Sequence, residues 1–427
     1  MPSIVGTAAH PQALDAIVQA SARCAIIASQ DIVDARGTRL WPRGQPVSPA
    51  LAHSLHAHKL AQPLEVCLDA RDGVTLFTLC TELRGLLEGS GAASQLLGAH
   101  ADMLLHEVKQ LDLHPVAQLL LTTAAATRPQ SLSHAVLAMA LAGALAASRE
   151  LNWLGSGRAT VRLAMLGGLL HDLGEVYLPP EHLGPTGPQG LAGHQQLMQH
   201  PRLAQRLLDA TTDYPRLLTQ AIGEHHERLD GSGYPARLLD PHLGALGKLL
   251  AVVEVATTVL GRHTAPASRL RLALQVVPGE FDTTCTDLLA HMARSLPESL
   301  PKGLPMARPH LPVWNGLAAR LARTRELAAA VRAQRRSDTA LLDIVRHAVK
   351  RLETLHAAWE ALGLWQQAGQ ALLPRTLFEL NLAEEALAER VQALQRECLL
   401  MSTPLRVVEK LQLAPLWQGL MDDRPGA

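Results

Sequence analysis

The stretch Leu169-Leu170-His171-Asp172-Leu173-Gly174 ends an apolar run that begins at Leu163. A histidine and an aspartate side by side at the end of a buried helix need an explanation, because a charge that is buried without a partner is costly. The pair is either an internally satisfied core cluster or part of a metal site. Taken alone, it leaves both explanations open.

A second polar cluster follows further along the chain, in His225-His226-Glu227-Arg228-Leu229-Asp230-Gly231-Ser232-Gly233-Tyr234-Pro235. His134, His200 and Glu254 complete the candidates. Each has an ordinary explanation by itself, as a core histidine, a helix joint, a solvated helix end or a salt-bridged carboxylate. Together, in one apolar helical region, they favour a metal site, since imidazole and carboxylate suit iron, manganese or zinc.

Composition narrows the class of protein. With 427 residues the chain is too long for one compact core, so two or three domains are expected. A formal net charge of zero gives no support to binding of a nucleic acid polymer. Five cysteines without a CxxC pair suggest neither a disulfide framework nor a cysteine zinc site. The longest apolar run, Ala135 to Ser148, is too short to span a bilayer, and no signal peptide is visible, so a cytoplasmic location is expected.

The pattern of apolar residues predicts a mainly α fold, with a helical bundle between a small N-terminal α/β module and a C-terminal helical region. Short strands and Gly-containing turns predict the α/β module. The expected parts are the module at 1–75, a helical connector at 76–128, the metal-dependent domain at 129–296, a proline-rich linker at 297–313, and a helical bundle or coiled coil at 314–427.

Long helices are expected in both helical regions. In the metal-dependent domain they run over His134–Arg149, Thr160–Leu173, Leu191–Ala210, Tyr214–His226 and Pro241–Leu260, and in the C-terminal region over Leu317–Arg335, Asp338–Leu362 and Pro374–Cys398. Each candidate metal ligand lies on or at the end of one of these helices, so that one bundle can direct them into a common pocket.

With these residues in view, the stretch from about Gln130 to Arg262 resembles an HD-GYP domain, a branch of the HD phosphohydrolase superfamily. The run from His225 to Pro235 keeps the HHExxDGxGYP signature complete, and His171-Asp172 matches the HD motif. His200 and His134 match two further histidines of the family. The resemblance implies an all-helical fold around two metal ions, with iron or manganese expected, and hydrolysis of cyclic di-GMP. Two metal ions suit that chemistry, because they acidify a water and hold the oxygens of an in-line displacement.

The resemblance also assigns roles to individual residues. One ion is held by His134, His171, Asp172 and Glu254, and the other by Asp172, His200, His225 and His226, with Asp172 bridging. The catalytic candidates are His171, Asp172 and Glu175, and the substrate-binding candidates are Arg228, Asp230, Gly233, Tyr234, Pro235 and Arg262. Tyr234 either stacks on guanine or plugs its own loop against the bundle.

The chain departs from the family pattern at several positions. Glu175 replaces the lysine of HDxGK, so the sign of the charge at this position is reversed. The interaction of two unit charges 5 Å apart is worth about 3 kcal/mol at an effective dielectric constant of 20. Glu254 replaces an aspartate, and Gly261-Arg262-His263 is what remains of an Arg-Pro-Tyr element. Gln130 stands where three-metal members carry a glutamate, which favours two ions.

Three hypotheses follow. The first is a cyclic di-GMP phosphodiesterase, favoured by the ligand set. The second is a degenerate HD-GYP module that binds a nucleotide or a protein without turnover, favoured by Glu175 and by the eroded segment after Glu254. The third is a phosphohydrolase acting on another phosphoester. The C-terminal helices are expected either to form a homodimer or to pack within one chain, and the N-terminal module to receive a signal or a protein partner.

Overall fold

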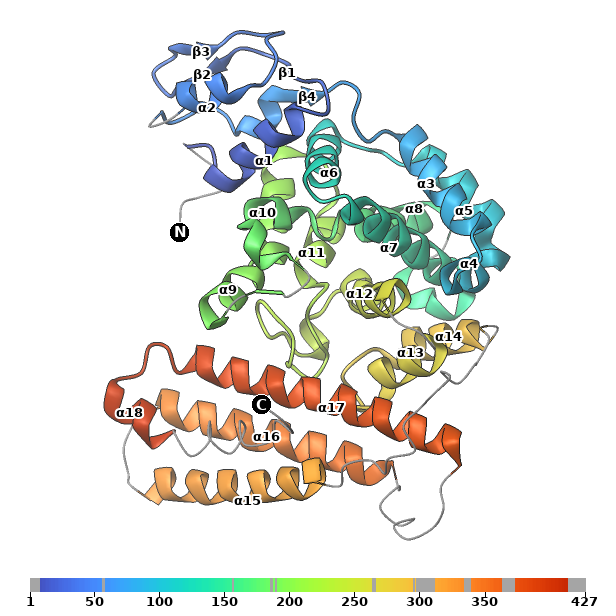
Figure 1. The fold of residues 1–427 in the computed structure, drawn as a ribbon, viewed down its shortest axis with the longest axis vertical. Helices are drawn as coiled ribbons and strands as arrows, with labels where there is room; N and C mark the ends of the chain where they lie inside the picture. The colour runs from blue at the N-terminus through green and yellow to red at the C-terminus, as the bar shows by residue number, and fades with distance from the viewer. Residues whose placement is uncertain are drawn as a thin grey trace. The chain divides into compact units, whose positions relative to one another are not determined.

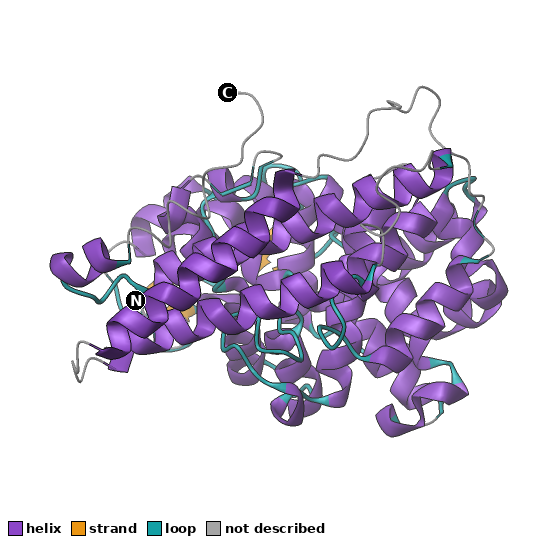
Figure 2. Ribbon diagram, turned by 90° about the horizontal axis from the view of Figure 1, so that it is seen from below, coloured by secondary structure: helices purple, strands orange, loops and turns teal. Residues whose placement is uncertain are grey.

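The computed structural model describes residues 8–55, 58–155, 157–184, 187–188, 190–262, 266–294, 296, 312–333, 339–362 and 373–413. Helices dominate this part of the chain, and the few short strands all lie before residue 71 (Figure 2). The expected mainly α fold with a small N-terminal α/β module is therefore confirmed. No helix among the described residues has the length and apolarity needed to cross a membrane.

The chain forms two compact units, one of residues 1–262 and 281–296 and the other of residues 263–280 and 297–427. In the first unit the N-terminal module comprises α1 (Pro11–Ser21), β1 (Ile26–Ala28), β2 (Ile32–Val33), β3 (Arg39–Trp41), α2 (Pro49–Leu55), the 3-10 turn η1 (Leu64–Cys67) and β4 (Leu68–Ala70). Strand β1 pairs with β4, and β2 with β3, both antiparallel. The sequence did not predict α1 or β4. Helix α2 ends at Leu55, and Leu60 forms an isolated bridge with Asp34.

The helical bundle follows this module (Figure 1). Its helices are α3 (Leu76–Glu88), α4 (Ala92–Leu97), α5 (Ala101–Glu107), α6 (Pro115–Thr127), α7 (Gln130–Ala146), α8 (Arg158–Leu170), α9 (Gly190–Leu197), α10 (His200–Thr211), α11 (Arg216–Glu224), α12 (Ala245–Arg262) and α14 (Thr283–Ala293). The short turn η5 (Leu173–Tyr177) connects the end of α8 to the rest of the bundle.

Helix α7 is the centre of the bundle, because every residue from Ala135 to Ala146 is buried. Helix α8 can lie directly against it because Gly168 has no side chain: a Cβ there would come within 2.4 Å of the carbonyl oxygen of Ala138. Gly143 also allows close packing, because a Cβ there would come within 2.6 Å of the side chain of Met165. This close packing brings the start of α7 beside the end of α8, where the HD pair stands.

One predicted helix, Leu191 to Ala210, is wrong. The structure has two helices, α9 and α10, with Met198 and Gln199 between them. Pro201 explains the break, because proline lacks the backbone N–H that a continuous helix needs and is tolerated only in a first turn. As a result His200 becomes the first residue of α10, and it is buried there.

The second unit has its own apolar core. It comprises α13 (Pro266–Gln275), α15 (Pro312–Ala333), α16 (Thr339–Ala361), α17 (Pro374–Met401) and α18 (Val407–Gln412). Leu352 and Leu355 of α16 and Leu394 of α17 are fully buried in this core, where the long helices pack together. The expected linker at 297–313 lies almost wholly outside the described residues.

A buried hydrogen bond connects the N-terminal module to the bundle. The hydroxyl of Tyr177, at the end of η5, donates to Oε1 of Glu65 in η1 at 2.6 Å. The ring of His10 packs edge-on against that of Tyr177, with centroids 5.3 Å apart. Burial raises the pKa of Glu65, although the hydrogen bond from Tyr177 acts in the opposite direction. The segment that follows Asp172 is thus anchored by a residue of the module.

We expect Tyr177→Phe to destabilise the first unit by about 1–3 kcal/mol, because the buried Glu65 carboxyl loses its donor. For a unit of this size the melting temperature falls by about 2–6 °C, measured by scanning calorimetry. Tyr177→Phe combined with Glu65→Leu recovers part of the loss. An unchanged melting temperature in the single variant would contradict the role of this bond.

Candidate metal centre

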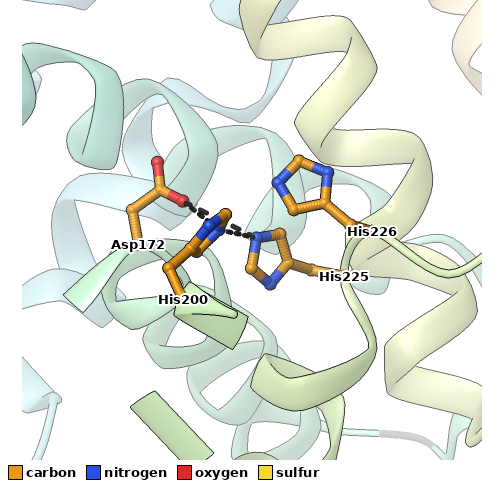
Figure 3. A group of neighbouring side chains, drawn as sticks. All are labelled: Asp172, His200, His225 and His226. Carbon is orange, nitrogen blue, oxygen red and sulfur yellow. Dashed lines mark hydrogen bonds and ion pairs between the residues drawn. The ribbon is translucent and has the colours of Figure 1, made fainter. Parts of the chain in front are cut away.

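The structure gathers all seven predicted ligands into one centre. Their donor atoms form two groups, each with its atoms within 4.8 Å of one another, and Asp172 belongs to both. One group is Asp172, His200, His225 and His226, and the other is His134, His171, Asp172 and Glu254. Figure 3 shows the first group, with the His200 ring between Asp172 and His225, and His226 beside them.

These side chains lie on, or directly after, five helices: α7, α8, α10, α11 and α12. His134 lies in the second turn of α7, and Glu254 lies within α12. His171 follows the last residue of α8, and Asp172 follows His171. His200 begins α10, and His225-His226 follow the last residue of α11. Helix ends therefore carry most of the ligands.

The two carboxylate oxygens of Asp172 face different groups. Its Oδ2 lies 3.2 Å from Nε2 of His171 and 3.4 Å from Nε2 of His134. Its Oδ1 lies 3.3 Å from Nε2 of His200 and 3.6 Å from Nε2 of His225. A carboxylate placed in this way can bridge two cations, one on each side.

The backbone orients three of the imidazoles. The Nδ1 atoms of His171, His200 and His225 lie 2.8, 2.8 and 2.6 Å from the carbonyl oxygens of Gly168, Leu197 and Ile222. A carbonyl only accepts, so each Nδ1 carries the proton and each Nε2 faces the centre. This is the arrangement that metal-ligating histidines usually have.

The contacts among these nitrogens fit a metal centre. Nε2 of His134 lies 3.2 Å from Nε2 of His171, and Nε2 of His200 lies 3.1 Å from Nε2 of His225. Two lone pairs repel at such a distance unless a proton or a cation lies between or beside them. Oε2 of Glu254 is also buried; it lies 3.2 Å from Nε2 of His171 and 3.5 Å from Nε2 of His134, but among the described residues it has no partner in hydrogen-bond geometry. Divalent metal ions would satisfy both features.

The pKa shifts differ in direction among the residues of the centre. Burial alone would raise the pKa of Asp172, but His171, His134 and His200 outweigh it and hold this pKa well below its usual range. Burial likewise opposes the charge on His134, yet Asp172 and Glu254 raise its pKa to about 9. Burial lowers the pKa of His225 to about 4, so this imidazole is neutral and available as a ligand at neutral pH.

The loop after His226 is held by two buried carboxylates. Glu227 accepts from the backbone N–H groups of Ala236 and Leu238 at 2.6 and 2.9 Å. Glu224 accepts from the N–H of Gly244 at 2.9 Å. These residues were not among the predicted site residues. The sequence could have indicated Glu227 as a site residue, because it directly follows the two histidines in the signature.

The predicted substrate-binding residues lie mainly in this loop. Asp230 accepts from the N–H of Ser232 at 3.0 Å, and Gly233 packs so closely on His226 and Glu227 that a Cβ would come within 2.4 Å of their backbone. The ring of Tyr234 stacks on that of His226, with centroids 4.5 Å apart. The Arg228 guanidinium lies 4.6 Å from the centroid of the Phe281 ring. Pro235 follows Tyr234 in the loop. Arg262 ends α12, and its side chain is outside the described part.

Glu175 does not stand as an isolated negative charge beside the centre. Its carboxylate forms an ion pair with the guanidinium of Arg128, which follows the last residue of α6. Burial and the nearby Asp172 raise the pKa of Glu175, whereas Arg128 lowers it. Arg128 was not predicted as a site residue, because an arginine before Pro129 has no distinctive pattern in the sequence.

With this geometry established, comparison with known proteins identifies the region. Residues 100–281 match the HD domain family. This region is an HD domain of the HD-GYP type. No solved structure matches the chain.

Three curated relatives are similar to parts of the chain. Over 158 residues the chain is 33% identical to cyclic di-GMP phosphodiesterase PA4108 of Pseudomonas aeruginosa, covering 37% of each protein. Over 142 residues it is 29% identical to the cyclic di-GMP phosphodiesterase response regulator RpfG of Xanthomonas campestris pv. campestris, covering 32% of this chain and 38% of the relative. Over 90 residues it is 30% identical to 3'3'-cGAMP-specific phosphodiesterase 1 of Vibrio cholerae, covering 21% of each. The matches thus span well under half of each relative.

We expect Gly174→Ala to weaken metal binding about 10- to 100-fold, as changes beside metal ligands commonly do. A Cβ at Gly174 would lie 1.9 Å from the carbonyl oxygen of His200, so the start of α10 has to move. Metal content after dialysis against a chelator gradient measures the loss. Gly85→Ala is the control, because a Cβ at Gly85 meets nothing within 4 Å. Equal metal retention in both variants would contradict this account.

Proposed function

We propose that this chain is a metal-dependent phosphodiesterase that hydrolyses cyclic di-GMP. The observation that carries the proposal is the position of Asp172, whose two oxygens face two separate groups of imidazoles. A centre of this form suits two cations, and paired cations are used for the hydrolysis of phosphodiesters. The relatives that share this domain are named for the hydrolysis of cyclic dinucleotides.

The proposed cofactors are two divalent ions, iron or manganese. Bound there, they would acidify a water and stabilise the attacking and leaving oxygens of an in-line displacement. The chain contributes rigid positioning: backbone carbonyls orient His171, His200 and His225, and Asp172 is shared between the two groups. The ligand roles of all seven residues are part of the proposal.

The proposed substrate class is the cyclic dinucleotides, with cyclic di-GMP first. Two of the relatives described above are named for cyclic di-GMP and one for 3'3'-cGAMP, so the latter is the comparison substrate. We place the substrate beside the loop of Arg228, Asp230, Gly233, Tyr234 and Pro235, with Arg262 at the end of α12. The stacking of Tyr234 on His226 supports a loop-packing role for its ring in preference to a guanine contact.

The ion pair of Glu175 with Arg128 bears on the alternative of a module that binds without turnover. That alternative was favoured by an uncompensated negative charge at position 175 and by the eroded segment after Glu254. The pairing compensates this charge within the chain. The homodimer, the signalling partner and the cytoplasmic location stay predictions. The long C-terminal helices already bury apolar residues against each other within the second unit, which weakens the reason for a dimer.

We expect purified protein, prepared without oxygen and supplied with iron(II) or manganese(II), to hydrolyse cyclic di-GMP. Chromatography of the products distinguishes the linear dinucleotide from GMP. The His171→Ala/Asp172→Ala variant should lose activity, because both groups lose a ligand. Metal-loaded protein without turnover would reject the enzyme in favour of a binding module. Turnover of 3'3'-cGAMP or another phosphoester alone would redirect the substrate assignment.

Metal content tests the two groups separately. We expect about two ions per wild-type chain, as in other two-metal phosphodiester sites. Glu254→Gln should remove about one of them, because Glu254 belongs to one group only, and His226→Gln should remove the other. Mass spectrometry of the metals after desalting gives the ratio. A single ion in the wild type, lost equally in both variants, would argue for one shared site.

A further inference from the structure

The ion pair between Arg128 and Glu175 is not used by the ligand assignments above. Glu175 stands three residues after Asp172, and its N–H donates to the carbonyl oxygen of Asp172 at 2.9 Å. The side chains of Arg128 and Glu175 are 25% and 17% exposed, and that of Asp172 is 26% exposed. Glu175 therefore lies on the same segment as Asp172, and both side chains of the pair are partly exposed to solvent.

The guanidinium of Arg128 has donors to spare. Its Nη1 donates to Oε2 of Glu175, and within the described chain its side chain has no other hydrogen-bonding or ionic partner. A guanidinium carries five N–H donors in a planar fork, which suits the simultaneous recognition of two oxyanions. One side of the fork is occupied by the carboxylate, and the remaining donors are available to a second anion.

The surroundings of Arg128 favour an anion. Arg128 directly precedes Pro129 and helix α7, which carries His134. The N-terminus of α7 has no side-chain cap, and its first turn contains no acidic residue. The partial positive charge of this helix end adds to that of the guanidinium. Without Arg128, the carboxylate of Glu175 would repel a phosphodiester placed beside it.

We propose that Arg128, oriented by Glu175, binds a phosphate oxygen of the cyclic dinucleotide beside the metal centre. This inference rests on the proposed function. Arg128 is then a substrate-binding residue, and Glu175 is a positioning residue that acts through it. The cation that the HD-GYP motif places at position 175 is supplied instead from the end of α6.

The test uses the full chain and three variants. Arg128→Gln/Glu175→Gln removes both charges together, so that no buried carboxylate is left unpaired. The KM for cyclic di-GMP should rise about tenfold or more, because a charge-assisted hydrogen bond is lost, while kcat changes less. Arg128→Gln/Glu175→Lys moves the cation to position 175 and should restore most of the affinity. Arg162→Gln is the control: Arg162 also pairs with a buried carboxylate, Glu107, which keeps Arg158 as a partner.

A second readout does not depend on the loaded enzyme. The dissociation constant for cyclic di-GMP is measured by calorimetry on metal-depleted protein and should follow the same order among the variants. If the Arg128→Gln/Glu175→Gln variant keeps the affinity and the KM of the wild type, the inference is overturned. Arg128 would then only balance the charge of Glu175. Faster turnover in that variant would also overturn it, since the pair would then block the site. Wild-type protein that neither binds nor hydrolyses cyclic di-GMP would instead reject the proposed function, and the role of Arg128 with it.

Discussion

The sharing of one carboxylate between two groups of imidazoles is the constraint on which the rest of the first unit depends. Asp172 can face both groups only if α7, α8, α10 and α11 bring their ends to within a few ångströms of it. Contacts at glycines, which have no side chain, allow the helices to approach this closely. Gly168 admits the backbone of α7, and Gly174 admits the backbone of α10 at His200. The glycines adjacent to the HD pair are therefore as much a part of the centre as its ligands.

Four of the seven proposed ligands could be predicted because their information is local. His171-Asp172 and His225-His226 are adjacent in the sequence, and each pair stands at the end of an apolar helix. A pattern of that kind survives without knowledge of the packing. The same is true of the mainly α fold, since a buried helix such as α7 is evident from its uninterrupted apolar residues.

Features that depend on distant contacts were not predictable. The pairing of Arg128 with Glu175 joins two residues that are 47 positions apart, and neither residue type is unusual in its own segment. Strand β4 is three residues long and exists through its pairing with β1. The break before α10 was different in kind. Pro201 indicates this break, whereas the apolar pattern on both sides of it predicts one continuous helix.

The bond between Tyr177 and Glu65 has a consequence for how this domain can be inherited. The part of the chain that matches the HD domain family begins at residue 100, yet the partner of Tyr177 lies upstream, in η1. The border of the matched sequence and the border of the folded unit therefore differ. Recombination that exchanged the N-terminal module at residue 100 would leave a buried tyrosine hydroxyl unpaired, a few residues after Asp172. Module and domain are expected to pass through evolution as one piece, or to change together at this contact.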